Sequence, residues 1–156
     1  MKSELKEIID LAINFEKESY VFYNGLVGTI KNRAVHGVLK ELATSEVFHR
    51  TTLENLAASI EDNSEKVFKE MDPKEIEDMK LGDYLLPVDL KPDSSFQDIL
   101  ITAMKREGNA HEFYVNMQKL AKSDESRKLF EFLAIEELEH KNIIEKLYDD
   151  KVYQEF

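Results

Sequence analysis

Residues 45–50, SEVFHR, place Glu46 and His49 three positions apart in a segment whose apolar residues follow a helical spacing. Residues three apart on a helix lie on one face. Leu39 and Leu42 fall on the same stripe, so a carboxylate and an imidazole face the predicted core. Burial of such groups destabilises a protein unless something pairs with them. The sequence therefore predicts a partner for both side chains.

The predicted partner is a second Glu-x-x-His, formed by Glu137 and His140, each 91 positions after its counterpart in the first motif. Each motif also follows, by 30 residues, a glutamate in the preceding helical segment. Aligning the two halves at this offset needs no gap and pairs further residues: Ala12 with Ala103, Glu16 with Glu107, Phe22 with Phe113, Tyr23 with Tyr114, Leu42 with Leu133, and Leu56 with Leu147. The halves are predicted to be copies related by a pseudo-two-fold axis.

Apolar residues alternate in threes and fours along four segments, which is the pattern of helices in a bundle. These segments cover residues 5–30, 35–60, 96–121 and 130–147. Short connections around 28–33 and 122–124 predict two antiparallel hairpins. Residues 61–93 contain all three prolines and are too long for a turn, so they form a crossover. The predicted fold is all-α, an antiparallel four-helix bundle of two hairpins in a single domain over residues 1–156.

Local signals refine the ends of these helices. Ser94 and Gln97 have the spacing of a capping box for the third helix, and Ser123 is a candidate N-cap for the fourth. A short helix is expected in the crossover after Asp72 and Pro73, because proline is favoured at the first helical position.

Composition excludes several classes of function. The net charge of −11, with scattered Lys and Arg, argues against nucleic acid or an anionic membrane as a partner. Without cysteine, the chain has no disulfide, no thiolate nucleophile and no iron–sulfur cluster. The N-terminal residues lack the apolar core of a signal peptide, and no run approaches the roughly 18 apolar residues of a membrane span. A cytoplasmic protein is expected.

The two motifs and the two upstream glutamates predict a dinuclear metal site. A Glu from each of two helices and a Glu-x-x-His from each of the other two is the known ligand pattern of di-iron and di-manganese bundle proteins. Two divalent cations would neutralise four buried carboxylates, and oxygen-rich ligation with one imidazole per metal suits iron or manganese. The alternative is a polar core layer without metal. The six predicted ligands are Glu16, Glu46, His49, Glu107, Glu137 and His140.

Position along the helices suggests a role for each ligand. Glu46 and Glu137 lie beside the histidines and are expected to bridge the metals, whereas Glu16 and Glu107 are expected to be terminal. The second ring nitrogen of each histidine needs an acceptor of its own.

Three further side chains lie near the predicted ligands. Tyr23 and Tyr114, seven residues after the terminal glutamates, are candidates to hydrogen-bond a ligand carboxylate, although core packing explains them equally well. His111 lies four residues after Glu107. It is either an additional ligand or, with greater weight, a partly exposed or hydrogen-bonded side chain.

The segments FEKESYVFY, SEVFH, KREGNAHEFY and EELEH resemble the rubrerythrin-like branch of the ferritin-like superfamily over about residues 5–148. The resemblance implies a ferritin-like fold and a di-iron centre that reacts with dioxygen or peroxide, usually in a homodimer. Rubrerythrins proper have a further carboxylate three residues after the helix-three glutamate, where this chain has Ala110. They also carry a cysteine-ligated rubredoxin module, so electrons would here come from a separate donor.

Three functions remain open at this point. The first is an oxidoreductase that reduces peroxide or dioxygen at two iron ions, with manganese as the other candidate metal. The second is ferrous iron oxidation and storage of the ferritin kind. The third is a non-catalytic protein in which the metals only hold the helices together.

Overall fold

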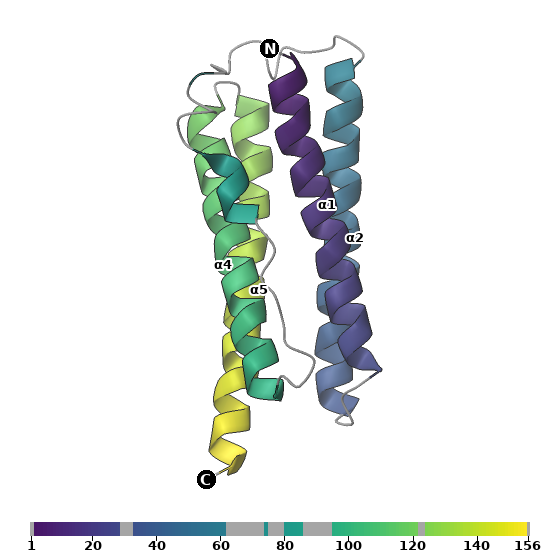
Figure 1. The fold of residues 1–156 in the computed structure, drawn as a ribbon, viewed down its shortest axis with the longest axis vertical. Helices are drawn as coiled ribbons and strands as arrows, with labels where there is room; N and C mark the ends of the chain where they lie inside the picture. Colours follow the sequence, from purple (N-terminus) through teal and green to yellow (C-terminus); the bar gives the residue numbers. More distant parts are fainter. Residues whose placement is uncertain are drawn as a thin grey trace. The chain divides into compact units, whose positions relative to one another are not determined.

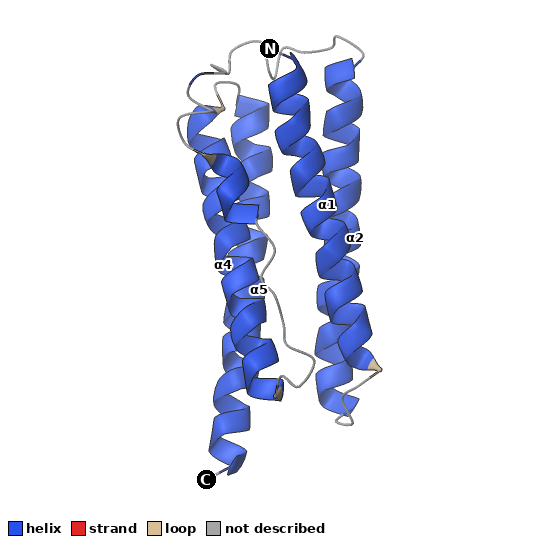
Figure 2. Cartoon of the chain, in the orientation of Figure 1, coloured by secondary structure: helices blue, strands red, loops and turns tan. Residues whose placement is uncertain are grey.

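The computed structural model describes residues 2–28, 33–61, 74, 80–85, 95–121 and 124–155. Within these ranges every long element is an α-helix, which confirms the all-α class (Figure 2). The chain divides into two compact units, Met1–Lys69 and Glu70–Phe156, and each holds one helical hairpin (Figure 1). The prediction of a single domain over residues 1–156 stays a prediction.

The N-terminal unit is an antiparallel hairpin of α1 (Lys2–Val27) and α2 (Arg33–Glu61). Both helices form because apolar residues recur at helical spacing while charged residues occupy the other faces. The buried stripe of α1 includes Ile9, Ala12 and Tyr23, and that of α2 includes Leu39 and Leu53. After α1 the chain turns at Gly28, whose amide donates to the Gly25 carbonyl over 3.3 Å.

The C-terminal unit is a second antiparallel hairpin, formed by α4 (Phe96–Leu120) and α5 (Asp124–Glu155). Its core is built from the corresponding stripes of the second copy: Leu100, Ala103, Phe113, Tyr114, Met117, Phe130, Leu133 and Ile144. Arg127, near the start of α5, contacts the end of α4: its Nε donates to the Ala121 carbonyl over 2.9 Å. The carbonyl of Ala121, just beyond the last residue of α4, thereby gains a hydrogen-bond partner.

The capping box of α4 lies one residue later than predicted. Ser95 is the N-cap: its hydroxyl accepts from the Asp98 amide over 3.1 Å, and the Asp98 carboxylate accepts from the Ser95 amide over 3.3 Å. The assignment to Ser94 and Gln97 is therefore wrong. Aspartate at the third helical position closes the box as well as glutamine would, and its charge also suits the helix N-terminus. The predicted N-cap Ser123 lies outside the described residues.

The crossover contributes one element that the sequence analysis did not predict, the short 3-10 helix η1 (Leu81–Leu85), which packs on α4. Leu81 and Leu85 are buried, and the helix follows Lys80, which has a positive φ of 48°. The Leu81 and Leu85 spacing was the available signal, but one turn is too short for periodicity to stand out. Except for Lys74, the helix predicted after Asp72 and Pro73 lies outside the described residues.

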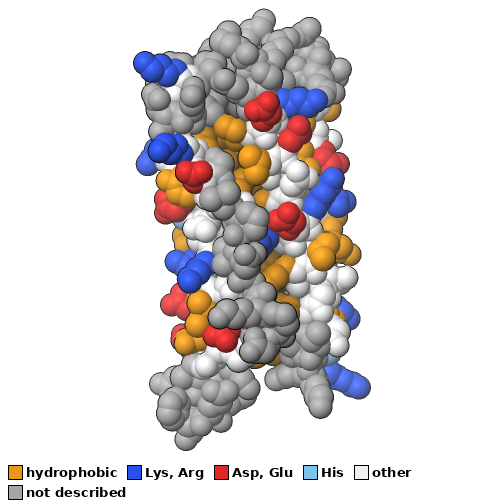
Figure 3. Space-filling view, viewed as in Figure 1, with side chains coloured by type: hydrophobic (Ala, Val, Ile, Leu, Met, Phe, Trp, Pro, Cys, Tyr) orange, Lys and Arg blue, Asp and Glu red, His pale blue; other side chains and the backbone are white. Residues whose placement is uncertain are grey.

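The outer surfaces of the helices are polar and mixed in charge. Figure 3 shows acidic and basic side chains interspersed with apolar ones on the face it presents. Among the described helices, none combines the length and apolar character needed to cross a membrane.

Candidate metal centre

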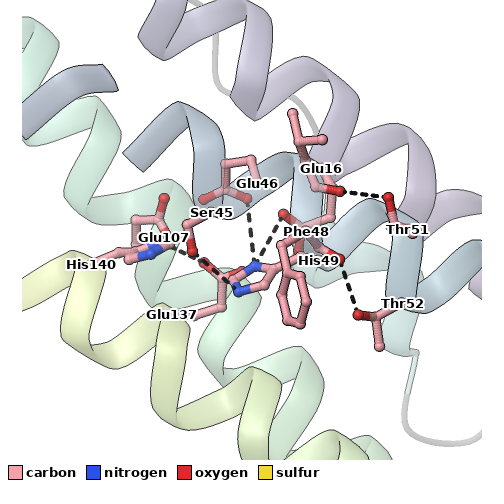
Figure 4. A network of polar contacts seen from close by, with 11 residues as sticks. Glu16, Ser45, Glu46, Phe48, His49, Thr51, Thr52, Glu107, Glu137 and His140 are labelled. Atoms are coloured by element: carbon pink, nitrogen blue, oxygen red, sulfur yellow. Dashed lines mark hydrogen bonds and ion pairs between the residues drawn. The ribbon is translucent and has the colours of Figure 1, made fainter. Parts of the chain in front are cut away.

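The N-terminal unit brings together one side chain from α1 and two from α2. The Nδ1 of His49 lies 3.6 Å from Oε2 of Glu16 and 3.8 Å from Oε2 of Glu46 (Figure 4). All three side chains are fully buried. The convergence follows from helix geometry, since Glu46 and His49 are one turn apart on α2 and the antiparallel α1 places Glu16 beside them. We call Glu16, Glu46 and His49 the N-terminal half-site.

The C-terminal unit repeats this arrangement with its own three residues. The Nδ1 of His140 lies 3.6 Å from Oε2 of Glu107 on α4 and 3.7 Å from Oε2 of Glu137 on α5 (Figure 4). Glu107 and Glu137 are at most 1% exposed and His140 is 5% exposed, so all three lie away from bulk water. We call Glu107, Glu137 and His140 the C-terminal half-site.

The repeat seen in the sequence is also a repeat in geometry. Corresponding distances in the two half-sites differ by at most 0.1 Å. The aromatic pairs beside them agree as well: Phe22 and Tyr23 meet edge to face at 5.4 Å and 79°, and Phe113 and Tyr114 do so at 5.2 Å and 78°. The two units are thus built on one plan.

The electrostatics of the C-terminal half-site favour a positive charge. Burial alone lowers the pKa of His140, but the nearby carboxylates of Glu107 and Glu137 outweigh this effect and raise the pKa to about 10. Two buried acids thus hold a proton on a ring whose ordinary pKa is 6.5. A divalent cation in the place of that proton would offset more of their charge.

The donor set of each half-site fits a metal ion. In each unit the two carboxylate oxygens and the imidazole nitrogen lie within 4.8 Å of one another. Ligands that bind a divalent ion at about 2.0–2.2 Å need only a small movement from such spacing. Two oxygens and one nitrogen, with no sulfur, are the donors that iron and manganese accept. Both clusters can therefore hold metal, and their residues are those predicted from the sequence.

Two further polar contacts involve His49 and His111. Ser45 Oγ lies 3.5 Å from Nε2 of His49, which identifies a partner for the second ring nitrogen that sequence reasoning missed. The signal was present, because Ser45 and His49 are four residues apart on one helix. His111 is half-buried, and its Nδ1 lies 2.7 Å from the Ala134 carbonyl oxygen. The reading of His111 as a hydrogen-bonded side chain is confirmed.

The tyrosines predicted to support the ligands are both part of the core. Tyr23 is 1% exposed and Tyr114 is fully buried, and each packs edge to face on its neighbouring phenylalanine. Packing thus explains their apolar rings. A hydrogen bond from either hydroxyl to a ligand carboxylate stays a prediction.

Comparison with known proteins agrees with this architecture. Residues 98–155 match the family model described as Rubrerythrin. A solved structure, a hypothetical protein from Pyrococcus furiosus, is similar with a TM-score of 0.70 and 23% sequence identity, over 93% of this chain and 88% of that chain. The comparison with curated proteins found no match.

These likenesses bear on the fold and on the family. The structural similarity shows that the two proteins share a fold. The family match covers α5 and nearly all of α4, and thus every residue of the C-terminal half-site. The family match confirms the predicted resemblance to the rubrerythrin-like branch over residues 98–155.

Proposed function

We propose that the two half-sites join into one dinuclear centre that holds two iron ions. The observation that carries the proposal is the paired geometry: two buried Glu, Glu, His clusters with nearly equal distances, on the two halves of a repeat. A two-helix hairpin cannot enclose its own apolar face, so packing of the two hairpins on each other would bury both stripes. Glu46 and Glu137 would then bridge the metals, with Glu16 and Glu107 terminal.

Charge balance supports two ions rather than one. Joined half-sites would bring together four buried carboxylates, Glu16, Glu46, Glu107 and Glu137. One divalent cation would leave about half of this charge uncompensated, whereas two would neutralise it. The match of residues 98–155 to the rubrerythrin family favours iron, and the donor set also accepts manganese.

We propose that the chain is an oxidoreductase of the rubrerythrin type, acting on peroxide or dioxygen. When bound, the iron pair supplies a redox couple and polarises the O–O bond of the substrate. The protein contributes ligands held by packed helices, and the buried aromatic layers of Tyr23 and Tyr114 would limit the access of water. Reduction of one hydrogen peroxide consumes two electrons and two protons and yields two waters.

The electrons would come from a separate donor protein. The sequence contains no cysteine, so it has no rubredoxin-type iron site of its own. Carboxylate ligands can change their mode of binding as the metal charge changes, and Glu46 and Glu137 would be the residues that do so. We further propose a homodimer as the working assembly.

Anaerobic titration with ferrous iron, followed by oxidant, tests the proposal. The wild-type protein should bind two equivalents per chain, then consume hydrogen peroxide in the presence of an artificial reductant. Glu107→Gln should lower iron binding, whereas Glu145→Gln, which changes an exposed glutamate of α5, should not. Binding of one equivalent would contradict the dinuclear centre.

Peroxide turnover and size separate the remaining functions. Full iron loading without turnover of peroxide or dioxygen would show that the metals have only a structural role. A hollow assembly of many subunits by size-exclusion chromatography, with iron accumulating beyond two per chain, would instead indicate storage.

A further inference from the structure

We propose that His111 is a positioning residue that makes the C-terminal half-site the first of the two to take up metal. This inference rests on the proposed function, because it concerns the order in which the proposed centre fills. Among the described residues, His111 makes a bond between the two helices of its unit beside the ligands.

His111 links the two helices of the C-terminal unit. Its Nδ1 is 2.7 Å from the carbonyl oxygen of Ala134, and the two residues lie on α4 and α5. Because a carbonyl oxygen only accepts, Nδ1 must be the donor, and this fixes the proton on that nitrogen. The carbonyl can accept this bond in addition to the one within α5, since it has two lone pairs. The bond therefore joins a side chain of α4 to the backbone of α5.

The bond lies in the layer next to the half-site. His111 follows Glu107 by one turn of α4, and Ala134 precedes Glu137 by one turn of α5. At a rise of 1.5 Å per residue, both steps amount to about 4.5–6 Å along the helices. Because the helices are antiparallel, the two steps run in the same direction in space. His111 thus fixes the approach of the two backbones one turn from where Glu107 and Glu137 meet His140.

The N-terminal unit lacks this bond. At the offset of the repeat, Tyr20 replaces His111 and Ala43 replaces Ala134. The tyrosine hydroxyl is at the far end of the ring, so the side chain has no donor at the position of Nδ1. Within the described part of the chain, Tyr20 makes no hydrogen bond. The Ser45 contact to His49 lies inside α2 and does not tie it to α1.

This difference has a consequence for metal binding. Ligands that are already held in place lose less conformational freedom when a metal binds, so the affinity is higher. The two half-sites are otherwise alike in distances and in ligand types. The half-site whose helices are tied by His111 should therefore bind the first ion, and the N-terminal half-site the second.

Half-site variants test the order of filling with Mn²⁺ alone as the probe, because free Mn²⁺ is measured directly by electron paramagnetic resonance. His49→Ala leaves the C-terminal half-site intact, and His140→Ala leaves the N-terminal one. The proposal predicts tighter Mn²⁺ binding in His49→Ala than in His140→Ala. Equal affinity, or the reverse order, would overturn it without any change at His111.

Variants at His111 then test the cause. In the His49→Ala background, His111→Leu should weaken Mn²⁺ binding by up to about tenfold, because His111 acts on the ligands only through the spacing of the two helices. His111→Asn keeps a donor at the position of Nδ1 and should restore much of the affinity. In the His140→Ala background, His111→Leu should change the affinity less than twofold. A loss of the same size in both backgrounds would show that His111 only supports general packing.

The outcomes distinguish this inference from the proposed function. If wild-type protein binds fewer than two Mn²⁺ or Fe²⁺ ions per chain, the dinuclear centre itself is refuted. If it binds two ions but the half-sites are equivalent and His111→Leu has no effect, only the role of His111 is refuted.

Discussion

Each half-site consists of two glutamates and one histidine that are at most 5% exposed. The charges of these side chains determine the stability of the metal-free protein. In the C-terminal half-site the carboxylates of Glu107 and Glu137 lie at ion-pair distance from His140 and favour its charged form, so the imidazolium offsets part of their negative charge. A bound cation would take over the position of the imidazolium proton. The charge state of a single ring thus links pH, stability and metal binding.

The raised pKa of His140 predicts that metal-free protein loses stability as the pH rises. A pKa of about 10 in the folded state, against 6.5 as the ordinary value, means that the imidazolium is stabilised by folding. This stabilisation is complete below about pH 6.5 and disappears as the pH passes through about 10. The urea concentration at the unfolding midpoint of chelator-treated protein should therefore decrease as the pH is raised from about 6.5 to about 10. His140→Gln should flatten the dependence, and an equally steep fall in that variant would assign it to another group.

The spacing of ligand-type residues was sufficient to predict both half-sites. In each unit, a Glu-x-x-His motif that lies 30 residues after another glutamate can meet it only if the turn between the two helices is short. The carbonyl of Ala134 as the partner of His111 was beyond such reasoning, because every residue has a carbonyl and the choice depends on how closely the two helices approach. Side-chain periodicity carries no information on that distance.

Helix ends show where local signals are ambiguous. Ser94 and Ser95 are adjacent, and either offers an oxygen to the first turn of α4. Asp98 favours Ser95, because its carboxylate is three residues on and receives the Ser95 amide. The capping box forms between Ser95 and Asp98, and the negative charge of Asp98 also interacts favourably with the helix dipole. Such one-residue differences move the cap but leave the buried stripe of the helix unchanged.

The capping box of α4 should contribute measurably to stability. Ser95→Ala removes the hydroxyl that accepts from the Asp98 amide and should lower the free energy of unfolding by about 1 kcal/mol. Thr51→Ala is a matched control, because Thr51 is exposed within α2 and its hydroxyl only returns to the Val47 carbonyl. Alanine favours a helix there, so the control should be neutral or slightly stabilising. Urea unfolding of both variants decides the point, and equal losses would mean that the box is not formed.

For the whole molecule, one helical hairpin has been used twice. The copies keep their ligands, their aromatic pairs and their buried stripes, while their outer positions have diverged. The repeat was visible in the sequence because buried and ligand-type positions kept their residue types. The crossover has no counterpart in the repeat, and its element η1 was accordingly not predicted.

Metal should stabilise the whole chain, because in the proposed joined centre binding would offset repulsion among the four buried glutamates. At a free concentration one hundred times the dissociation constant, a single ion adds about 2.7 kcal/mol to the free energy of unfolding. For a chain of this size that corresponds to a rise in Tm of about 5–10 °C. Thermal unfolding with metal and after chelation measures it at neutral pH. An unchanged Tm would mean that the glutamates are not buried together.

The distance between the two metals tests the central claim most directly. Iron loaded at two equivalents per chain should give metal–metal scattering at about 3.5–4 Å in X-ray absorption, as in other dinuclear sites. Replacement of His49 and His140 together by alanine should abolish the signal. Two bound ions without any metal–metal scattering would show that each half-site binds its ion alone, and this result would contradict the proposal of a joined dinuclear centre.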